Sequence, residues 1–110
     1  MKIPEVNKKY NCFDDGKIQE SRRYEVIITE IIPFYDINEE ILLNWKENVK
    51  DCYWLYSEKT DVFIKAVDED GEDEIFVRTK DNGWFSIGGF FGCGRLDADG
   101  ELTKLLDSRM

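Results

Sequence analysis

The sequence predicts an α+β fold in which an antiparallel sheet of about five strands carries one main amphipathic helix. A β-branched run occupies residues 24–34, an apolar stripe of helical period follows it directly, and alternating segments joined by turn residues fill residues 61–88. At 110 residues, 42% of them hydrophobic, the chain is expected to form one domain, 1–110, around a single core.

The first two strands differ in strength. "KKYNCFDDGKI" predicts a short strand that ends in a turn at Asp15-Gly16. "YEVIITEIIPF", residues 24–34, is the strongest strand signal because it is β-branched, apolar on both faces and closed by Pro33. Apolar residues on both faces predict a central strand that is covered on one side by a helix.

The helix follows at once in "DINEEILLNWKENVKDC", residues 36–52. Asp36 is the predicted N-cap, and Glu39, three residues later, would complete a capping box. One apolar stripe recurs at spacings of three and four residues, which predicts core packing: Ile37, Ile41, Trp45, Val49 and Cys52.

The second half of the chain reads as a meander. "YWLY" could form a short strand, and "DVFIKAV" and "EIFVRTKD" alternate well around the acidic loop "DEDGED". Asn82-Gly83 predicts a two-residue type I′ hairpin into "WFSIGG". A glycine-rich bend, a "DADG" turn and a short helix "ELTKLLD" complete the chain. The alternative fold is a small SH3-like barrel with an inserted helix.

Charge constrains the partner. The net charge is −9; residues 1–24 contribute +2 (six Lys/Arg, four acids) and residues 25–110 contribute −11 (nine Lys/Arg, twenty acids). Such a surface repels the phosphate backbone, so direct nucleic-acid binding is disfavoured and a partner protein with a basic surface is expected. The alternative is that acidity serves only solubility and that a structural or regulatory subunit binds through an apolar patch.

The cysteine pattern and the hydropathy of the chain indicate the cellular compartment in which we expect the protein. Cys12, Cys52 and Cys93 are scattered and form no CxxC pair, as in a reduced, cytoplasmic protein. The first ten residues contain no apolar signal region, and no run approaches the ~18 apolar residues of a membrane span. We therefore expect a cytoplasmic protein without membrane association.

The stretch "DADGEL" resembles the middle of a calcium loop. With Asp97 and Asp99 at positions 3 and 5, Gly100 falls correctly at position 6, but Arg95 and Leu106 occupy the ligand positions 1 and 12. We interpret it as a turn, with a calcium-binding module as a less favoured alternative. We expect no metal and no cofactor.

Catalytic chemistry finds little support. The chain contains no histidine, which excludes Cys–His and Ser–His nucleophiles and histidine-ligated metals. No carboxylate spacing singles out an acid–base pair, so we expect a non-enzymatic protein with no catalytic residues.

The residues expected to bind a partner fall into two groups. Carboxylates would steer association with a Lys/Arg-lined groove, and aromatic side chains would supply a desolvated anchor. The acidic group is Asp68, Glu69, Asp70, Glu72, Asp73 and Glu74 in one loop, with Asp97, Asp99 and Glu101 near the C-terminus; the aromatic group is Trp84, Phe90 and Phe91.

The run "KKYNCFDDGKIQESRRYEVIITEIIPF", residues 8–34, resembles small acidic bacterial proteins carried on mobile elements. In size, acidity and lack of a catalytic constellation the whole chain is similar to anti-CRISPR and anti-restriction proteins and to immunity proteins that neutralise nuclease toxins. This likeness of class implies an inhibitor that occludes a basic, nucleic-acid-handling surface, and it assigns no residue.

Overall fold

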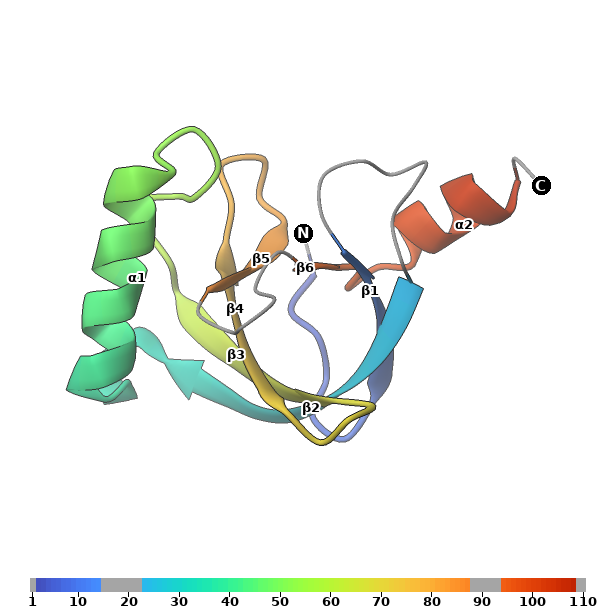
Figure 1. Ribbon diagram of the computed structural model, residues 1–110, viewed down its shortest axis with the longest axis horizontal. Coiled ribbons are helices and arrows are strands. Elements are labelled where there is room, and N and C mark those ends of the chain that lie inside the picture. The colour runs from blue at the N-terminus through green and yellow to red at the C-terminus, as the bar shows by residue number, and fades with distance from the viewer. Residues whose placement is uncertain (1, 15–22, 88–93, 109–110) are drawn as a thin grey trace.

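The computed structural model describes residues 2–14, 23–87 and 94–108. In these ranges six antiparallel strands form a closed barrel in which each strand pairs with the next along the chain and the last pairs with the first (Figure 1). The elements in order are β1 (Lys9–Asp14), β2 (Arg23–Pro33), the 3₁₀ turn η1 (Phe34–Asp36), α1 (Glu39–Asp51), β3 (Val62–Asp68), β4 (Asp73–Arg78), β5 (Trp84–Ile87), β6 (Gly94–Leu96) and α2 (Glu101–Asp107).

The predicted open sheet of about five strands is therefore wrong. The three-residue strand β6, which lacks any strand pattern in the sequence, pairs with β5 and, through Cys12↔Leu96, with β1. These pairings remove both sheet edges, which is how a barrel avoids unpaired strands. The alternative of a small barrel with an inserted helix agrees in part, since α1 lies between β2 and β3 in the chain.

The two faces of the barrel strands carry two separate cores. Ile64, Phe76 and Trp84 belong to the cluster inside the barrel. Their sequence neighbours Phe63, Val77 and Phe85 belong to a second cluster that packs against α1. Successive side chains of a strand point to opposite faces, so β3, β4 and β5 each contribute to both cores. The two cores explain why the sequence of residues 24–34 is apolar on both faces of the strand.

A bulge in β2 changes which side chains of this strand face each core. The register with β3 shifts between Ile28 and Glu30, so Ile28 and Ile31 both contribute to the inner cluster although they are an odd number of positions, three, apart in the strand. Ile32 then faces the outer cluster beneath α1. An inserted residue of this kind bends a strand, as closing a small barrel requires.

Helix α1 lies along the outside of the barrel (Figure 1). Trp45 is buried, and Ile37, Ile41, Val49 and Cys52 pack against the outer cluster, which confirms the predicted stripe. The predicted capping box is wrong. Asp36 ends the 3₁₀ turn η1, and the N-cap is Asn38, whose side-chain oxygen accepts a hydrogen bond from the Ile41 N–H at 2.9 Å.

One strand prediction and one turn prediction also need correction. "YWLY" forms no strand: residues 52–55 are a turn, and Tyr56 makes one isolated bridge to Thr79. The β4–β5 connection spans residues 79–83, and the Asn82 N–H donates to the Thr79 carbonyl at 3.0 Å. Within this connection only Asn82 has a positive φ, 64°, whereas a type I′ turn needs two such residues.

The remaining C-terminal elements were predicted correctly. Strands β3, β4 and β5 form the expected meander, and α2 coincides with "ELTKLLD". The turn predicted at Asp15-Gly16 lies outside the described residues. Within the described ranges, no helix is long and apolar enough to span a bilayer.

Candidate functional site

The β3–β4 hairpin is shaped by one of its own acids. The Asp68 side chain accepts hydrogen bonds from the backbone N–H groups of Asp70 and Glu72, each at 2.9 Å, and Gly71 adopts a φ of 81°. Asp68 therefore builds the turn rather than facing a partner, as Asx turns do.

Two other acids of this loop make contacts across the barrel. The Glu69 carboxylate accepts a hydrogen bond from the Glu25 backbone N–H at 2.8 Å. Glu74 is half-buried and accepts a hydrogen bond from the Tyr24 hydroxyl at 3.0 Å. Glu74 thus belongs to the barrel, whereas Glu69 remains exposed while fixing the hairpin against β2.

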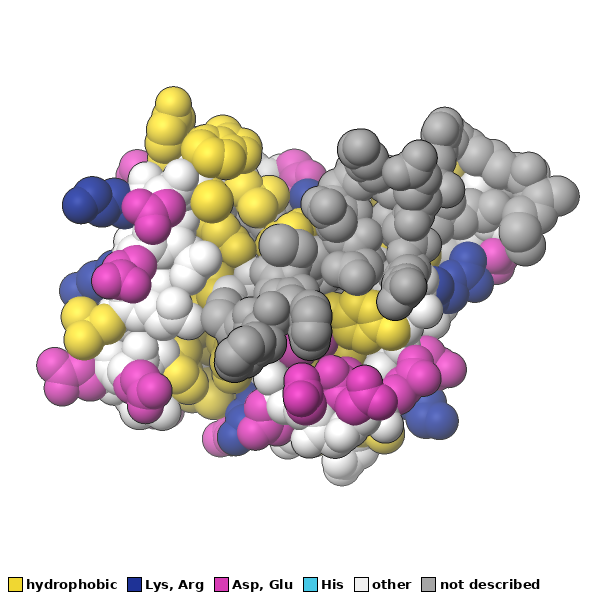
Figure 2. Space-filling model, viewed as in Figure 1, with side chains coloured by type: hydrophobic (Ala, Val, Ile, Leu, Met, Phe, Trp, Pro, Cys, Tyr) yellow, Lys and Arg dark blue, Asp and Glu magenta, His cyan; other side chains and the backbone are white. Residues whose placement is uncertain are grey.

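The other carboxylates gather on one exposed surface. Figure 2 shows acidic side chains concentrated at the end of the barrel where the β3–β4 hairpin turns. We define the acidic tip as the exposed carboxylates of this hairpin and its β2 neighbour: Glu25, Glu69, Asp70, Glu72 and Asp73. Their concentration produces a strong local negative potential.

The "DADG" segment is the turn that the sequence predicts. Asp97 is only 3% exposed, and its carboxylate accepts hydrogen bonds from the N–H groups of Leu102 and Thr103 and from the Thr103 hydroxyl. Asp99 accepts a hydrogen bond from the Glu101 N–H at 3.1 Å, and Gly100 has a φ of 78°. Both carboxylates thus stabilise the start of α2, while Glu101 is exposed in its first turn.

Of the three predicted aromatic anchors, the structure describes Trp84, and it does not lie at the acidic tip. Trp84 is fully buried inside the barrel, and its Nε1–H donates to the Lys2 carbonyl at 3.1 Å, so its ring is not available to a partner. Phe90 and Phe91 lie outside the described residues. Among the described residues, no group of three or more potential metal ligands comes together.

Sequence reasoning missed an exposed aromatic pair. Tyr53 and Trp54 directly follow α1, are 64% and 66% exposed, and contact each other edge to face with ring centroids 5.5 Å apart. The available signal was the end of the helical stripe at Cys52, after which these two side chains no longer belong to the buried face. Exposed aromatic clusters of this kind are typical of binding surfaces.

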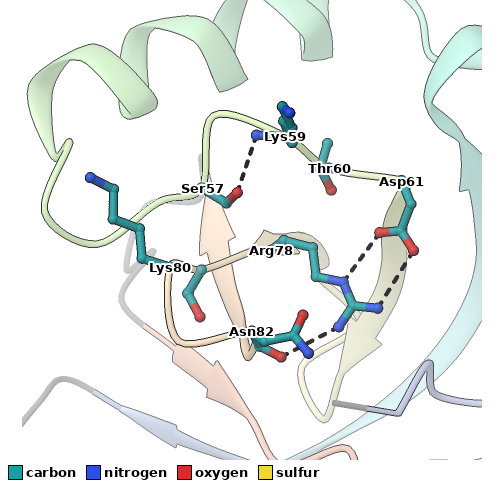
Figure 3. Close-up of a pocket in the computed structure, with 8 residues that line it drawn as sticks. Ser57, Lys59, Thr60, Asp61, Arg78, Lys80 and Asn82 are labelled. Atoms are coloured by element: carbon teal, nitrogen blue, oxygen red, sulfur yellow. Dashed lines mark hydrogen bonds and ion pairs between the residues drawn. The ribbon is translucent and has the colours of Figure 1, made fainter.

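A cationic pocket lies beside this pair, between the loop preceding β3 and the β4–β5 hairpin (Figure 3). Its volume is about 460 Å³, and its lining includes Ser57, Lys59, Asp61, Arg78, Lys80 and Asn82. Three of its lining residues are cations and one is an acid, in a chain where acids outnumber bases 24 to 15. The pocket is therefore locally positive on an acidic protein.

Arg78 is held rigidly in this pocket. Its guanidinium carbon lies 4.0 Å from the centroid of the Trp84 ring, and its Nε donates to Asp61 Oδ1 at 3.2 Å. Burial is the largest single influence and would raise the pKa of Asp61, but the hydrogen bond and charge of Arg78 together with the backbone N–H groups of Asp61 and Val62 outweigh it and hold that pKa below its ordinary value. Asp61 thus stays ionised and fixes the arginine side chain.

The neighbouring hairpin loop has a similar ion pair. A hydrogen bond from the Thr79 hydroxyl lowers the pKa of Asp81, and Arg95, 3.2 Å away, lowers it further. These contacts tie the loop that forms one wall of the pocket to Thr79 and Arg95.

A second cavity, of about 530 Å³, separates the N-terminal segment from α2. Its charges are nearly balanced, with lysines 2, 8, 9 and 104 against Asp97, Asp99 and Asp107. This cavity has neither the excess charge nor the exposed aromatic side chains of the first one.

Cysteine chemistry offers no further site in the described residues. Cys12 and Cys52 are free thiols, and Cys93 lies outside the described residues. Burial raises the pKa of Cys12 far above its ordinary value, so this thiol stays protonated and unreactive.

No family model matches the chain, and the comparisons with curated proteins and with solved structures gave no significant match.

Proposed function

We propose that this protein is a non-enzymatic binding module of the cytoplasm that occludes a basic surface of a nucleic-acid-handling protein. The acidic tip is the observation that supports this function most directly. Five exposed carboxylates project from one end of a rigid barrel, on a chain of net charge −9. The class likeness of the sequence to inhibitors and immunity proteins points in the same direction.

The mechanism is electrostatic competition. Carboxylates of the acidic tip take the place of the phosphates that a Lys/Arg-lined groove normally binds, and the field of the tip accelerates encounter. The Asp68 turn and the Glu69 bond to β2 hold the hairpin in place before binding. Such preorganisation limits the entropy lost on association.

The test is a pull-down from a bacterial lysate, washed at low salt and at about 0.5 M salt, where screening leaves a range of about 4 Å. We expect a basic nucleic-acid enzyme to be retained at low salt and released at high salt. A partner that survives 0.5 M salt would instead indicate an apolar interface, and acidity would then serve only solubility.

A triple charge reversal, Asp70→Lys, Glu72→Lys and Asp73→Lys, tests the acidic tip directly. These carboxylates are exposed, and Asp68 is kept because its side chain builds the turn. We expect association with the retained partner to slow by about tenfold or more. The matched control reverses three exposed acids elsewhere, Glu30, Glu40 and Glu47, with the same change in net charge. Equal effects of the two triple variants would contradict a local role for the tip.

A further inference from the structure

We propose that the cationic pocket and the Tyr53–Trp54 pair together form a binding site for a nucleoside phosphate. The phosphate would lie in the pocket beside Lys59 and Arg78, Lys80 would extend from the pocket toward the aromatic pair, and the base would stack on that pair. This site is independent of the acidic tip, which lies at the opposite end of the barrel from the loop that follows α1 (Figure 1).

The positive charge of the pocket favours the binding of a small anion. The pocket residues carry a net charge of +2, from Lys59, Arg78 and Lys80 against Asp61, within a protein of net charge −9. Glu58 lies exposed in the same loop but does not line the cavity. A positive pocket in an acidic surface concentrates small anions, while the surrounding charge disfavours an extended polyanion.

The arginine is preorganised for the task. Its side chain is 13% exposed, held between the Trp84 ring and Asp61, and the guanidinium also approaches the Asn82 carbonyl at 3.4 Å (Figure 3). A guanidinium that is already fixed loses little conformational entropy when it meets a phosphate.

Lys80 connects the pocket with the aromatic pair. Its backbone N–H donates to the Leu55 carbonyl at 2.9 Å, and its side chain extends away from Arg78, with Nζ 5.9 Å from the centroid of the Tyr53 ring (Figure 3). Trp54 continues this surface in contact with Tyr53. Cations beside exposed aromatic faces are the arrangement that binds phosphate and base together. A cavity of about 460 Å³ is within the range of small-molecule sites, roughly 300–1,000 Å³.

The experiment is an NMR titration of the ¹⁵N-labelled protein with AMP, inorganic phosphate and adenosine, each at constant ionic strength. We expect AMP to shift the Trp54 indole signal and the amides around Lys59 and Lys80, with a Kd about tenfold lower than that of either fragment. Equal affinity for AMP and phosphate, or shifts confined to other regions, would overturn the proposal. So would a single-stranded oligonucleotide that binds more tightly than AMP.

Variants separate the two halves of the site. Lys59→Gln with Lys80→Gln should weaken AMP binding by about tenfold, whereas Lys46→Gln with Lys104→Gln, two exposed lysines elsewhere, should leave it unchanged. Trp54→Ala should weaken AMP but not phosphate, and Tyr35→Ala, which removes a 94% exposed aromatic side chain elsewhere, is its control. If both lysine pairs weaken AMP equally, the attraction is only a net-charge effect and the pocket is not a site.

Discussion

Gly94 is the position where a single methyl group should disturb the closure of the barrel. A Cβ at this residue would lie 2.0 Å from the Tyr24 hydroxyl oxygen and 3.1 Å from Cζ of the same ring. Gly94 has no positive φ, so the backbone itself would accept alanine. Glycine is needed here because β6 passes so closely over the Tyr24 side chain.

The expected loss of stability in Gly94→Ala follows from the contacts that Tyr24 would lose. To admit the methyl group, its hydroxyl must move and lose the 3.0 Å hydrogen bond to Glu74, or β6 must shift. A lost hydrogen bond to a carboxylate costs about 1.5–3 kcal/mol, and overpacking a well-filled core costs about 1–3 kcal/mol. Since moving the hydroxyl relieves part of the overlap, we expect Gly94→Ala to lower the free energy of unfolding by about 3 kcal/mol. For a domain of this size that corresponds to a fall in Tm of about 13 °C.

Urea unfolding followed by tryptophan fluorescence measures this change, and Tyr24→Phe provides the control. Removal of the hydroxyl costs the Glu74 hydrogen bond, about 2 kcal/mol, but it also deletes the atom that collides with the new methyl group. The double variant Tyr24→Phe, Gly94→Ala should therefore be only about 0.5 kcal/mol less stable than Tyr24→Phe alone, because Cζ at 3.1 Å needs a small adjustment. Additive effects of the two substitutions, or a Gly94→Ala protein as stable as the parent, would refute the close approach of β6 to Tyr24.

The remaining predictions concern the N-terminal caps of the two helices and the dependence of the free energy of unfolding on pH in acid. Asn38→Ala removes the hydrogen bond at the start of α1 and should lower the free energy of unfolding by about 1 kcal/mol in urea titrations, whereas Asp36→Ala should change it by less than about 0.5 kcal/mol. Asp97→Ala leaves the buried N–H groups of Leu102 and Thr103 without their acceptor, so we expect a loss of about 2 kcal/mol and a smaller helical signal in circular dichroism; unchanged helicity would contradict the cap. Because the pKa of Asp81 is lowered in the folded protein, its contribution to stability is present above the unfolded pKa, about 4, and is lost as pH falls through the lower folded pKa. Asp81→Asn should therefore make the free energy of unfolding less steeply dependent on pH below about 4, and an unchanged slope would show that the Thr79 hydrogen bond and the ion pair with Arg95 are not maintained in solution.

Local patterns were sufficient for most elements of this chain. The apolar stripe from Ile37 to Cys52 predicts the buried face of α1, and the alternation of β3 and β4 predicts the meander, because both signals lie within one segment. The turn at Asp97–Gly100 was likewise readable, since its hydrogen bonds join residues close in sequence. The cap of α1 was misplaced by two residues because Asp36 and Asn38 are equally good cap residues by type.

The candidate sites likewise combine features that the sequence shows with features that only the fold shows. The concentration of carboxylates in residues 68–74 is visible in the sequence, but only the fold shows that Asp68 builds the turn and that Glu74 reaches Tyr24. The cationic pocket could not be predicted, because Lys59 and Arg78 come from segments that meet only when the loop before β3 packs beside β4. Trp84 was placed on the surface because alternation alone does not say which face of a strand is inside.

By itself the sequence determined the acidic character, the position of the main helix and the strands of the meander, because composition and periodicity are local properties. Tertiary structure alone decided that the sheet closes. Residues 94–96 carry no strand signal, and they become β6 only because β1 and β5 offer unpaired edges on both sides. The strands β1 and β6 lie near opposite ends of the chain. The hydrogen bonds between them close the barrel, and they therefore form only after the rest of the chain has folded around its core.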